Sequence, residues 1–177
     1  LLADSEPTVR IAAALAVGLF RDQSSLIRLS DLLLEDREIE VRQAAAQALA
    51  ETLLPQAVPY FIEAMADSFW WYEREPAATD LLNAIQLMDE AAIDPLIEAL
   101  GDPEGTIRRF AARLLGELRA VRAVETLGMA LYDLHNEVGR AAALALGSIG
   151  EASLDVLELA IQHPEPDIRQ NAALGLG

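Results

Sequence analysis

A short pattern recurs along the sequence with a period close to 30 residues. Each copy has an acidic turn, an apolar anchor residue and then an alanine-rich stretch, as in DREIEVRQAAAQALA at residues 36–50. The anchors are spaced 32, 36, 30, 31 and 30 residues apart, and they are Val9, Val41, Ala77, Ile107, Val138 and Ile168. A fixed period of this length is the signature of a repeat protein whose units pack only against their neighbours. The period therefore predicts a solenoid.

Each unit contains two helical patterns. After the anchor, alanine recurs at the fourth position and an aliphatic residue at the eighth, which places one stripe on one helix face. A second helix is predicted at residues 26–34, 58–65, 93–100, 124–131 and 154–161. No segment alternates apolar and polar residues as a half-buried strand would. The sequence thus predicts an all-α fold, an α-solenoid of about five two-helix repeats.

Small residues recur at fixed positions of the first helix. The alanine four positions after the anchor predicts a close helix crossing, because a larger side chain would not fit there. Glycine stands nine positions after the anchor in four units, at Gly18, Gly116, Gly147 and Gly177. These glycines predict a helix end that needs a left-handed residue.

The repeats divide the chain into consecutive units. Their limits are near residues 4–35, 36–66, 67–101, 102–132 and 133–162, with a half unit at 163–177. Residues 1–3 match the last turn of a preceding second helix, and the half unit stops before its own second helix. We therefore expect one array over residues 1–177 that is a segment of a longer solenoid.

The signature D-x4-[VI]-R-x2-A-A-x2-L-G, with a following helix of the AVxxLxxAL type, resembles the HEAT-like repeat of phycobilisome lyases. The resemblance covers nearly the whole chain and implies a ladder of Asp–Arg contacts between neighbouring repeats. The ladder positions are Arg10, Arg42, Arg108, Arg169, Asp36, Asp67, Asp102 and Asp133. An alternative is that these arginines bind acidic ligands, but regular repetition favours a role in assembly.

Two units depart from the signature. The fifth has Gly139 where arginine is expected, with Arg140 one position later. In the third, the first helix is predicted to begin near Pro76, and its core positions are filled by Leu81, Ile85 and Met88.

The third unit also contains an insertion at residues 68–76, SFWWYEREP. It brings together four consecutive aromatic residues, Phe69, Trp70, Trp71 and Tyr72. Tryptophan and tyrosine are enriched where binding energy concentrates, so these residues are candidates for partner contact. The alternative is local repair, in which they cover the gap left by the missing arginine and alanine of this unit.

The composition excludes several kinds of chemistry. There are 29 Asp and Glu against 13 basic residues, all of them arginine, so the net charge of -16 disfavours nucleic acid as a partner. Without lysine there is no Schiff base and no Walker-type phosphate loop. Without cysteine there is no disulfide, thiolate metal site or cysteine nucleophile. No apolar run reaches the ~20 residues of a membrane span, so we expect no membrane association and a cytoplasmic setting.

Six acids lie off the apolar face of the second helices. They are Asp31, Glu63, Asp94, Glu98, Glu125 and Asp155. If these helices stack side by side, the acids form a stripe on the inner surface, and such concave surfaces are where solenoids bind partners. A basic partner would be attracted to this field. The alternative is a solvated face without a partner.

Catalytic and metal sites are not indicated. His135 and His163 stand in turns one repeat apart and lack the paired His-Glu motif of HEAT-like iron hydroxylases, so we expect turn or capping roles. The carboxylates are too numerous to single out an acid–base pair. We expect no catalytic, cofactor-binding or metal-binding residues in this segment.

Two functions follow. The first is a non-catalytic scaffold that binds a protein on its concave acidic face, on the aromatic insertion 68–72, or on both. The second comes from the resemblance, which implies part of a phycobilin lyase or a phycobiliprotein-handling factor. Because the chain has no cysteine, it would present a bilin or a phycobiliprotein without a thioether bond.

Overall fold

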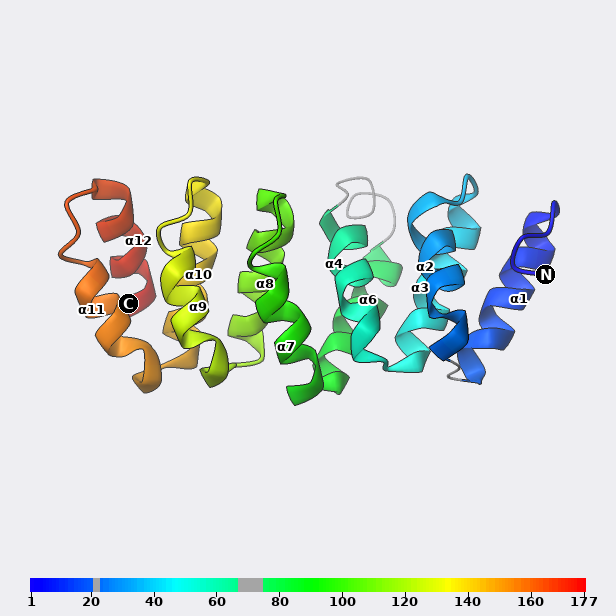
Figure 1. Cartoon of the computed structure of the whole chain (residues 1–177), viewed down its shortest axis with the longest axis horizontal. Coiled ribbons are helices and arrows are strands. Elements are labelled where there is room, and N and C mark those ends of the chain that lie inside the picture. The colour runs from blue at the N-terminus through cyan, green and yellow to red at the C-terminus, as the bar shows by residue number, and fades with distance from the viewer. Residues whose placement is uncertain (21–22, 67–74) are drawn as a thin grey trace. The chain divides into compact units, whose positions relative to one another are not determined.

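The computed structural model describes residues 1–20, 23–66 and 75–177, and these ranges contain helices and turns but no strand (Figure 1). The first helices of the repeats, here called A helices, are α1 (Pro7–Leu19), α3 (Ile39–Thr52), α6 (Glu75–Met88), α8 (Gly105–Glu117), α10 (Asn136–Ile149) and α12 (Pro166–Leu176). The second or B helices are α2 (Leu26–Glu35), α4 (Val58–Ala66), α7 (Glu90–Ala99), α9 (Val124–Ala130) and α11 (Leu154–Ala160). The predicted all-α solenoid fold is confirmed.

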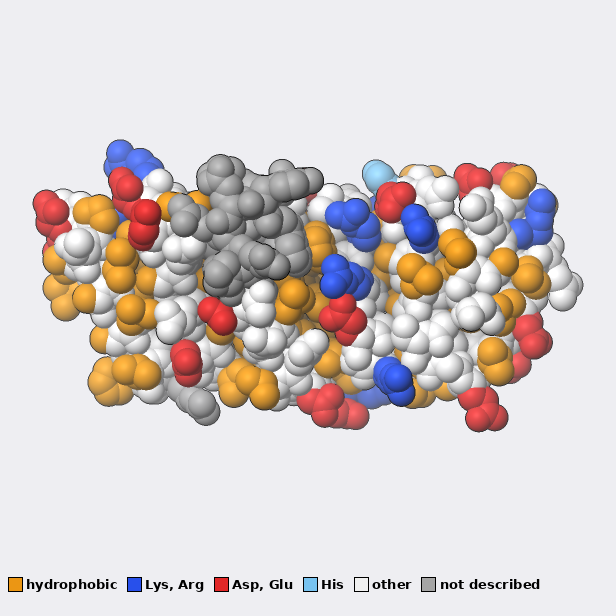
Figure 2. Space-filling view, turned by 180° about the vertical axis from the view of Figure 1, so that it is seen from behind, with side chains coloured by type: hydrophobic (Ala, Val, Ile, Leu, Met, Phe, Trp, Pro, Cys, Tyr) orange, Lys and Arg blue, Asp and Glu red, His pale blue; other side chains and the backbone are white. Residues whose placement is uncertain are grey.

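The chain forms two compact units, residues 1–92 and residues 93–177. In the first, α3 packs against α1 and α6, while α2 packs against α4. In the second, α10 packs against α8 and α12, while α9 packs against α11. Each unit therefore has a layer of A helices and a layer of B helices, with the core between them. Figure 2 shows apolar side chains that remain exposed on the side opposite to that of Figure 1.

The predicted stripes form most of this core, but Leu154, Ile161 and Leu176, which were expected in it, are 41%, 38% and 39% exposed. The alanines four positions after the anchors are at most 9% exposed, and they are Ala13, Ala45, Ala111, Ala142 and Ala172. Leu81, Ile85 and Met88 are also buried, as predicted for the third repeat. The repeat period and the helical spacing together were thus enough to identify the buried face.

The B helices begin where predicted in four repeats, at Leu26, Val58, Val124 and Leu154. Each of these helices follows a short 3-10 turn. In the third repeat the helix begins earlier than predicted, at Glu90. Here Asp89 turns the chain with a φ of 46°, and the acid at Glu90 suits a helix N-terminus, so no separate 3-10 turn precedes the helix.

The prediction that the repeated glycines end helices in a left-handed conformation is wrong for three of the four, whereas Gly177 directly follows α12. Gly18, Gly116 and Gly147 lie inside helices, and among the described residues the one glycine with positive φ is Gly150. The left-handed residues stand twelve positions after the anchors instead, at Leu53, Asp89, Arg119 and Gly150. The repeated glycines serve helix packing: a Cβ atom on Gly18 would lie 2.7 Å from the Cα atom of Ala48 in the next A helix.

Candidate functional site

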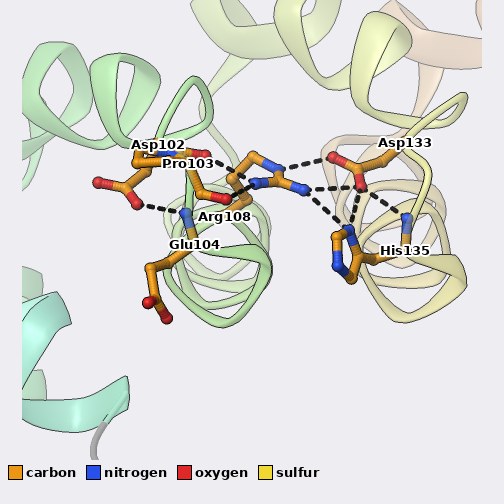
Figure 3. Close-up of polar contacts among 6 residues, drawn as sticks. All are labelled: Asp102, Pro103, Glu104, Arg108, Asp133 and His135. Carbon is orange, nitrogen blue, oxygen red and sulfur yellow. Dashed lines mark hydrogen bonds and ion pairs between the residues drawn. The ribbon is translucent and has the colours of Figure 1, made fainter.

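Arg108 joins two consecutive turns of the repeat array (Figure 3). Its Nε and Nη2 atoms donate hydrogen bonds to the two carboxylate oxygens of Asp133, at 2.7 and 2.9 Å. Its Nη1 atom donates to the carbonyl oxygens of Asp102 and Pro103, at 2.7 and 2.9 Å. The side chains of Arg108 and Asp133 are each 12% exposed. A shielded, bidentate pair of this kind is stronger and more directional than a single exposed ion pair.

Arg10 makes the same contacts in the first repeat. Its Nε and Nη2 atoms donate to Asp36 at 2.8 and 2.9 Å. Its Nη1 atom donates to the carbonyl oxygens of Asp4 and Ser5, at 2.8 and 3.2 Å. In both places the arginine of one repeat holds the aspartate of the next, which is the geometry that the Asp–Arg ladder requires.

The two aspartates also stabilise their own turns. Asp133 accepts a hydrogen bond from the backbone N–H of His135 at 2.8 Å, and Asp36 accepts one from that of Glu38 at 3.0 Å. The hydrogen bond from Arg108 lowers the pKa of Asp133 below its ordinary value, against the opposing effect of burial. Burial also acts to raise the pKa of Asp36, but the hydrogen bond from Arg10 and that from the backbone together outweigh it and lower this pKa.

The other ladder arginines bind main-chain carbonyl groups. Arg42 donates from Nε to the Leu33 carbonyl oxygen at 2.8 Å, and Asp67, its expected partner, lies outside the described residues. Arg169 donates from Nη1 to the carbonyl oxygens of residues 163 and 164, at 2.7 and 2.6 Å. Arg169 therefore holds the turn before its own helix, whereas Arg42 binds the last part of α2, the preceding B helix.

In the fifth repeat, a hydrogen bond between two asparagine side chains takes the place of the Asp–Arg ion pair. A Cβ atom on Gly139 would lie 2.9 Å from the Leu131 carbonyl oxygen and 3.2 Å from the Nδ2 atom of Asn171. Asn171 is 5% exposed and donates to the Oδ1 atom of Asn136 at 3.0 Å. The missing arginine thus leaves room for a side chain from α12, and a neutral hydrogen bond links α12 to α10.

Both histidines take part in turns. The Nδ1 atom of His135 lies 3.1 Å from Nη2 of Arg108 and 3.3 Å from Oδ1 of Asp133. His163 stands at the aspartate position of the last repeat, and its Nδ1 atom accepts a hydrogen bond from the Glu165 N–H at 3.2 Å. Within residues 1–20, 23–66 and 75–177, no group of three or more His, Cys, Asp or Glu side chains could hold a metal ion.

The predicted B-helix acids all lie on exposed positions, at Asp31, Glu63, Asp94, Glu98, Glu125 and Asp155. Asp94 accepts a hydrogen bond from Nη2 of Arg122 at 2.6 Å. The other five make no hydrogen bond or ion pair with any residue of the described ranges. Their charge is therefore available to a partner.

Sequence reasoning missed two apolar residues on the same helices. Met129 is 65% exposed and Leu159 is 69% exposed, each one turn after an acid, Glu125 and Asp155 respectively. They stand five positions after Val124 and Leu154, and the equivalent positions of α2, α4 and α7 carry acids. The sequences of the five B helices show this change from acid to methionine or leucine directly.

The two helices that present these residues pack closely. A Cβ atom on Gly128 of α9 would lie 3.0 Å from Cγ1 of Val156 in α11. The exposed faces of α9 and α11 are therefore adjacent, and each contributes an acid and an apolar residue at matching positions. We refer to Asp94, Glu98, Glu125, Met129, Asp155 and Leu159 as the B-helix surface.

Two further expectations concern other parts of the chain. The aromatic residues Phe69, Trp70, Trp71 and Tyr72 lie outside the described residues. Of the helices that are described, none has the length and apolar character needed to cross a membrane.

The family model for HEAT repeats matches residues 1–81 and 93–177 of this chain. Among curated relatives, phycocyanobilin lyase subunit beta of Pseudanabaena tenuis (strain PCC 7409) is 35% identical over 106 residues, which cover 59% of this chain and 36% of that protein. Deoxyhypusine hydroxylase-B of Oryza sativa subsp. japonica is 27% identical over an alignment that covers 96% of this chain and 65% of that protein. The chain thus spans less than two thirds of the length of either relative.

A solved structure of Drosophila melanogaster Mini spindles TOG3 shares the fold, with a TM-score of 0.69 and 14% identity over 99% of this chain and 89% of that one. The family match extends over both compact units and over every described A and B helix except part of α6 and α7. The chain belongs to the HEAT-repeat family.

Proposed function

We propose that this chain is a non-catalytic scaffold that binds another protein, and that the B-helix surface is the binding site. One observation carries the proposal: exposed Met129 and Leu159 stand in matching positions on adjacent helices, each one turn from an unpaired acid. Scattered exposed apolar residues are ordinary. Two that recur in register, bordered by acids, are typical of a surface that docks an amphipathic helix.

The charge of the surface indicates the kind of partner. Of its four acids, Asp94 alone is paired with another described residue, and the whole chain carries a net charge of -16. Acids arranged in this way attract a basic partner and speed its association. Apolar side chains from that partner would pack on Met129 and Leu159, where truncation is expected to matter most. We therefore infer a basic, amphipathic segment as the bound element.

A binding measurement with a defined probe tests this function. The probe is a fluorescein-labelled helical peptide of lysine and leucine, with leucine at positions i, i+3, i+4 and i+7. Met129→Ser combined with Leu159→Ser should weaken its binding in fluorescence anisotropy about tenfold or more. Leu134→Ser is the control, since Leu134 is 99% exposed in the turn between α9 and α10 and is not one of the B-helix surface residues. Equal affinities for the three proteins would refute the proposed site.

The aromatic insertion 68–72 is a second proposed contact. It is supported by its composition and by its absence from the other repeats. Replacing Trp70 and Trp71 by alanine should then abolish partner binding with little change in melting temperature. A large drop in melting temperature, with binding retained by the folded fraction, would instead assign these residues to the core.

A bilin-related role is a second candidate function. It is supported by the 35% identity to phycocyanobilin lyase subunit beta. In that case the chain would hold a bilin or phycobiliprotein without covalent attachment, because it has no cysteine. Co-expression with a bilin-producing pathway and an acceptor phycobiliprotein should then give a coloured acceptor. An acceptor that stays colourless with the chain present would remove this candidate and leave the scaffold unaffected.

A further inference from the structure

A groove lies between α8 and α10 on the A-helix side of residues 93–177, with a volume of about 430 Å³. Its apolar lining includes Phe110, Ala141 and Leu144, and Leu144 is 47% exposed. Arg109 and Arg113 line it from α8 and Arg140 lines it from α10. In Figure 2 basic side chains gather beside apolar and acidic ones near the middle of this face. The groove is separate from the B-helix surface and shares no residue with it.

The side chains of the three arginines make different contacts. Arg113 donates from Nε to Glu117 at 2.8 Å, an exposed pair within α8. The guanidinium of Arg109 lies 5.3 Å from the ring centre of Phe110. The side chain of Arg140 makes no hydrogen bond or ion pair with any described residue. Among the residues that the structure describes, the guanidinium groups of Arg109 and Arg140 therefore have no acidic partner.

Arginines outnumber acids in the groove, whereas acids outnumber arginines in the whole chain. Three arginines and two acids, Glu117 and Glu137, line the groove, whereas the whole sequence has 29 acids and 13 arginines. Guanidinium groups match carboxylates in a planar, two-pronged geometry. A ligand that pairs with Arg109 and Arg140 while it covers Leu144 must be both acidic and apolar.

The dimensions of the groove suit a short peptide. Along α8 it extends from Arg109 to Glu117, which corresponds to roughly 12 Å of helix. About three to four residues of extended chain span that length. In an extended peptide, successive side chains point to opposite sides. A sequence that alternates acidic and apolar residues would therefore direct its carboxylates to the arginines and its apolar side chains to Leu144.

We propose that the α8–α10 groove binds an extended, acidic peptide segment with alternating apolar residues, independently of the B-helix surface. Its recognition elements are Arg109 and Arg140 for the carboxylates and Leu144 for the apolar side chains. Glu117 limits the affinity because it pairs with Arg113 and adds negative charge at one end of the groove.

The test uses the full chain and a fluorescein-labelled octapeptide of alternating aspartate and leucine. Arg109→Gln combined with Arg140→Gln should weaken binding at least tenfold in fluorescence anisotropy. Arg28→Gln is the control for loss of positive charge, since Arg28 is exposed on α2 and does not line the groove. Glu117→Gln should tighten binding about threefold or more, a change that loss of folding cannot produce.

Two comparison ligands complete the test. An octapeptide of alternating asparagine and leucine should bind at least tenfold more weakly than the aspartate peptide, and inorganic phosphate should not displace the latter at millimolar concentration. The proposal is overturned if the double arginine variant binds like Arg28→Gln, if Glu117→Gln does not bind more tightly, or if the asparagine peptide binds equally well. Full displacement by phosphate would overturn it too, because it would show a simple anion site.

Discussion

The main chains of α8 and α10 touch at Gly116 and Ala145: a Cβ atom on Gly116 would lie 2.6 Å from the Cα atom of Ala145. The same relationship joins Gly18 to Ala48 in the first repeat pair. In each pair a glycine near the end of one A helix meets a small residue of the next A helix. The spacing between consecutive repeats is therefore set by the absence of side chains at these crossings.

We predict that Gly116→Ala lowers the free energy of unfolding. The added methyl group would force two helix backbones apart, and overpacking of this kind costs about 1–3 kcal/mol, partly offset by about 1 kcal/mol of helix propensity. Gly101→Ala is the matched control, because its Cβ atom would meet nothing closer than 3.4 Å. Urea denaturation of both variants measures the difference. Equal stabilities would show that the helix pair can separate without cost.

A second prediction concerns acid. The pKa of Asp133 is lowered in the folded state, so its contribution to stability is present above the pKa of an unfolded aspartate, about 3.9, and is lost as the pH falls through the lower folded value. Asp36 behaves in the same way. The free energy of unfolding should therefore fall as the pH drops below about 4.

The variant Asp133→Asn isolates this effect. It should be less stable than the natural chain at pH 7 by about 1–3 kcal/mol, because Arg108 loses a charged partner. It should also lose less stability than the natural chain between pH 4 and pH 2. Denaturation curves over this range provide the measurement. Parallel curves for the two proteins would mean that the Arg108–Asp133 pair does not control acid stability.

At Gly139 the repeat signature and the local packing favour different residues. The signature favours arginine at this position, yet a Cβ atom there would meet the Leu131 carbonyl oxygen at 2.9 Å and the side chain of Asn171 at 3.2 Å. We predict that Gly139→Arg destabilises the chain by about 1–3 kcal/mol. Thermal unfolding measures the change. A higher melting temperature would show that the signature, rather than the local packing, decides this position.

The repeat period was sufficient to predict the fold, the buried alanines and the start of four B helices. These features depend on apolar spacing, which the sequence displays directly. The role of the repeated glycines was not predictable in the same way. Gly116 is conformationally ordinary, and its importance comes from Ala145, a residue of a different repeat.

The candidate sites, too, could be predicted from the sequence only in part. The exposure of the six B-helix acids followed from helical spacing. The exposure of Met129 and Leu159 was not predicted, because apolar residues on a helix are expected on its buried face. The α8–α10 groove depends on residues of two repeats and on the size of the cavity between them, which no single helix pattern contains.

A further prediction tests electrostatic attraction at the B-helix surface. Glu98→Arg combined with Glu125→Arg should slow association of the lysine–leucine peptide and make its rate less dependent on salt. Glu104→Arg with Glu151→Arg changes the net charge equally at exposed positions outside this surface. Stopped-flow fluorescence measures both pairs. If the two double variants associate at the same rate, the peptide senses only the total charge.

The three methionines allow the most direct test of the proposed binding site. Met129 is 65% exposed on the B-helix surface, whereas Met65 and Met88 are 1% and 8% exposed in the core. In a chain with ¹³C-labelled methionine methyl groups, titration with the lysine–leucine peptide should shift the Met129 resonance and leave the Met65 and Met88 resonances in place. Saturating binding that leaves the Met129 resonance unmoved would contradict the account.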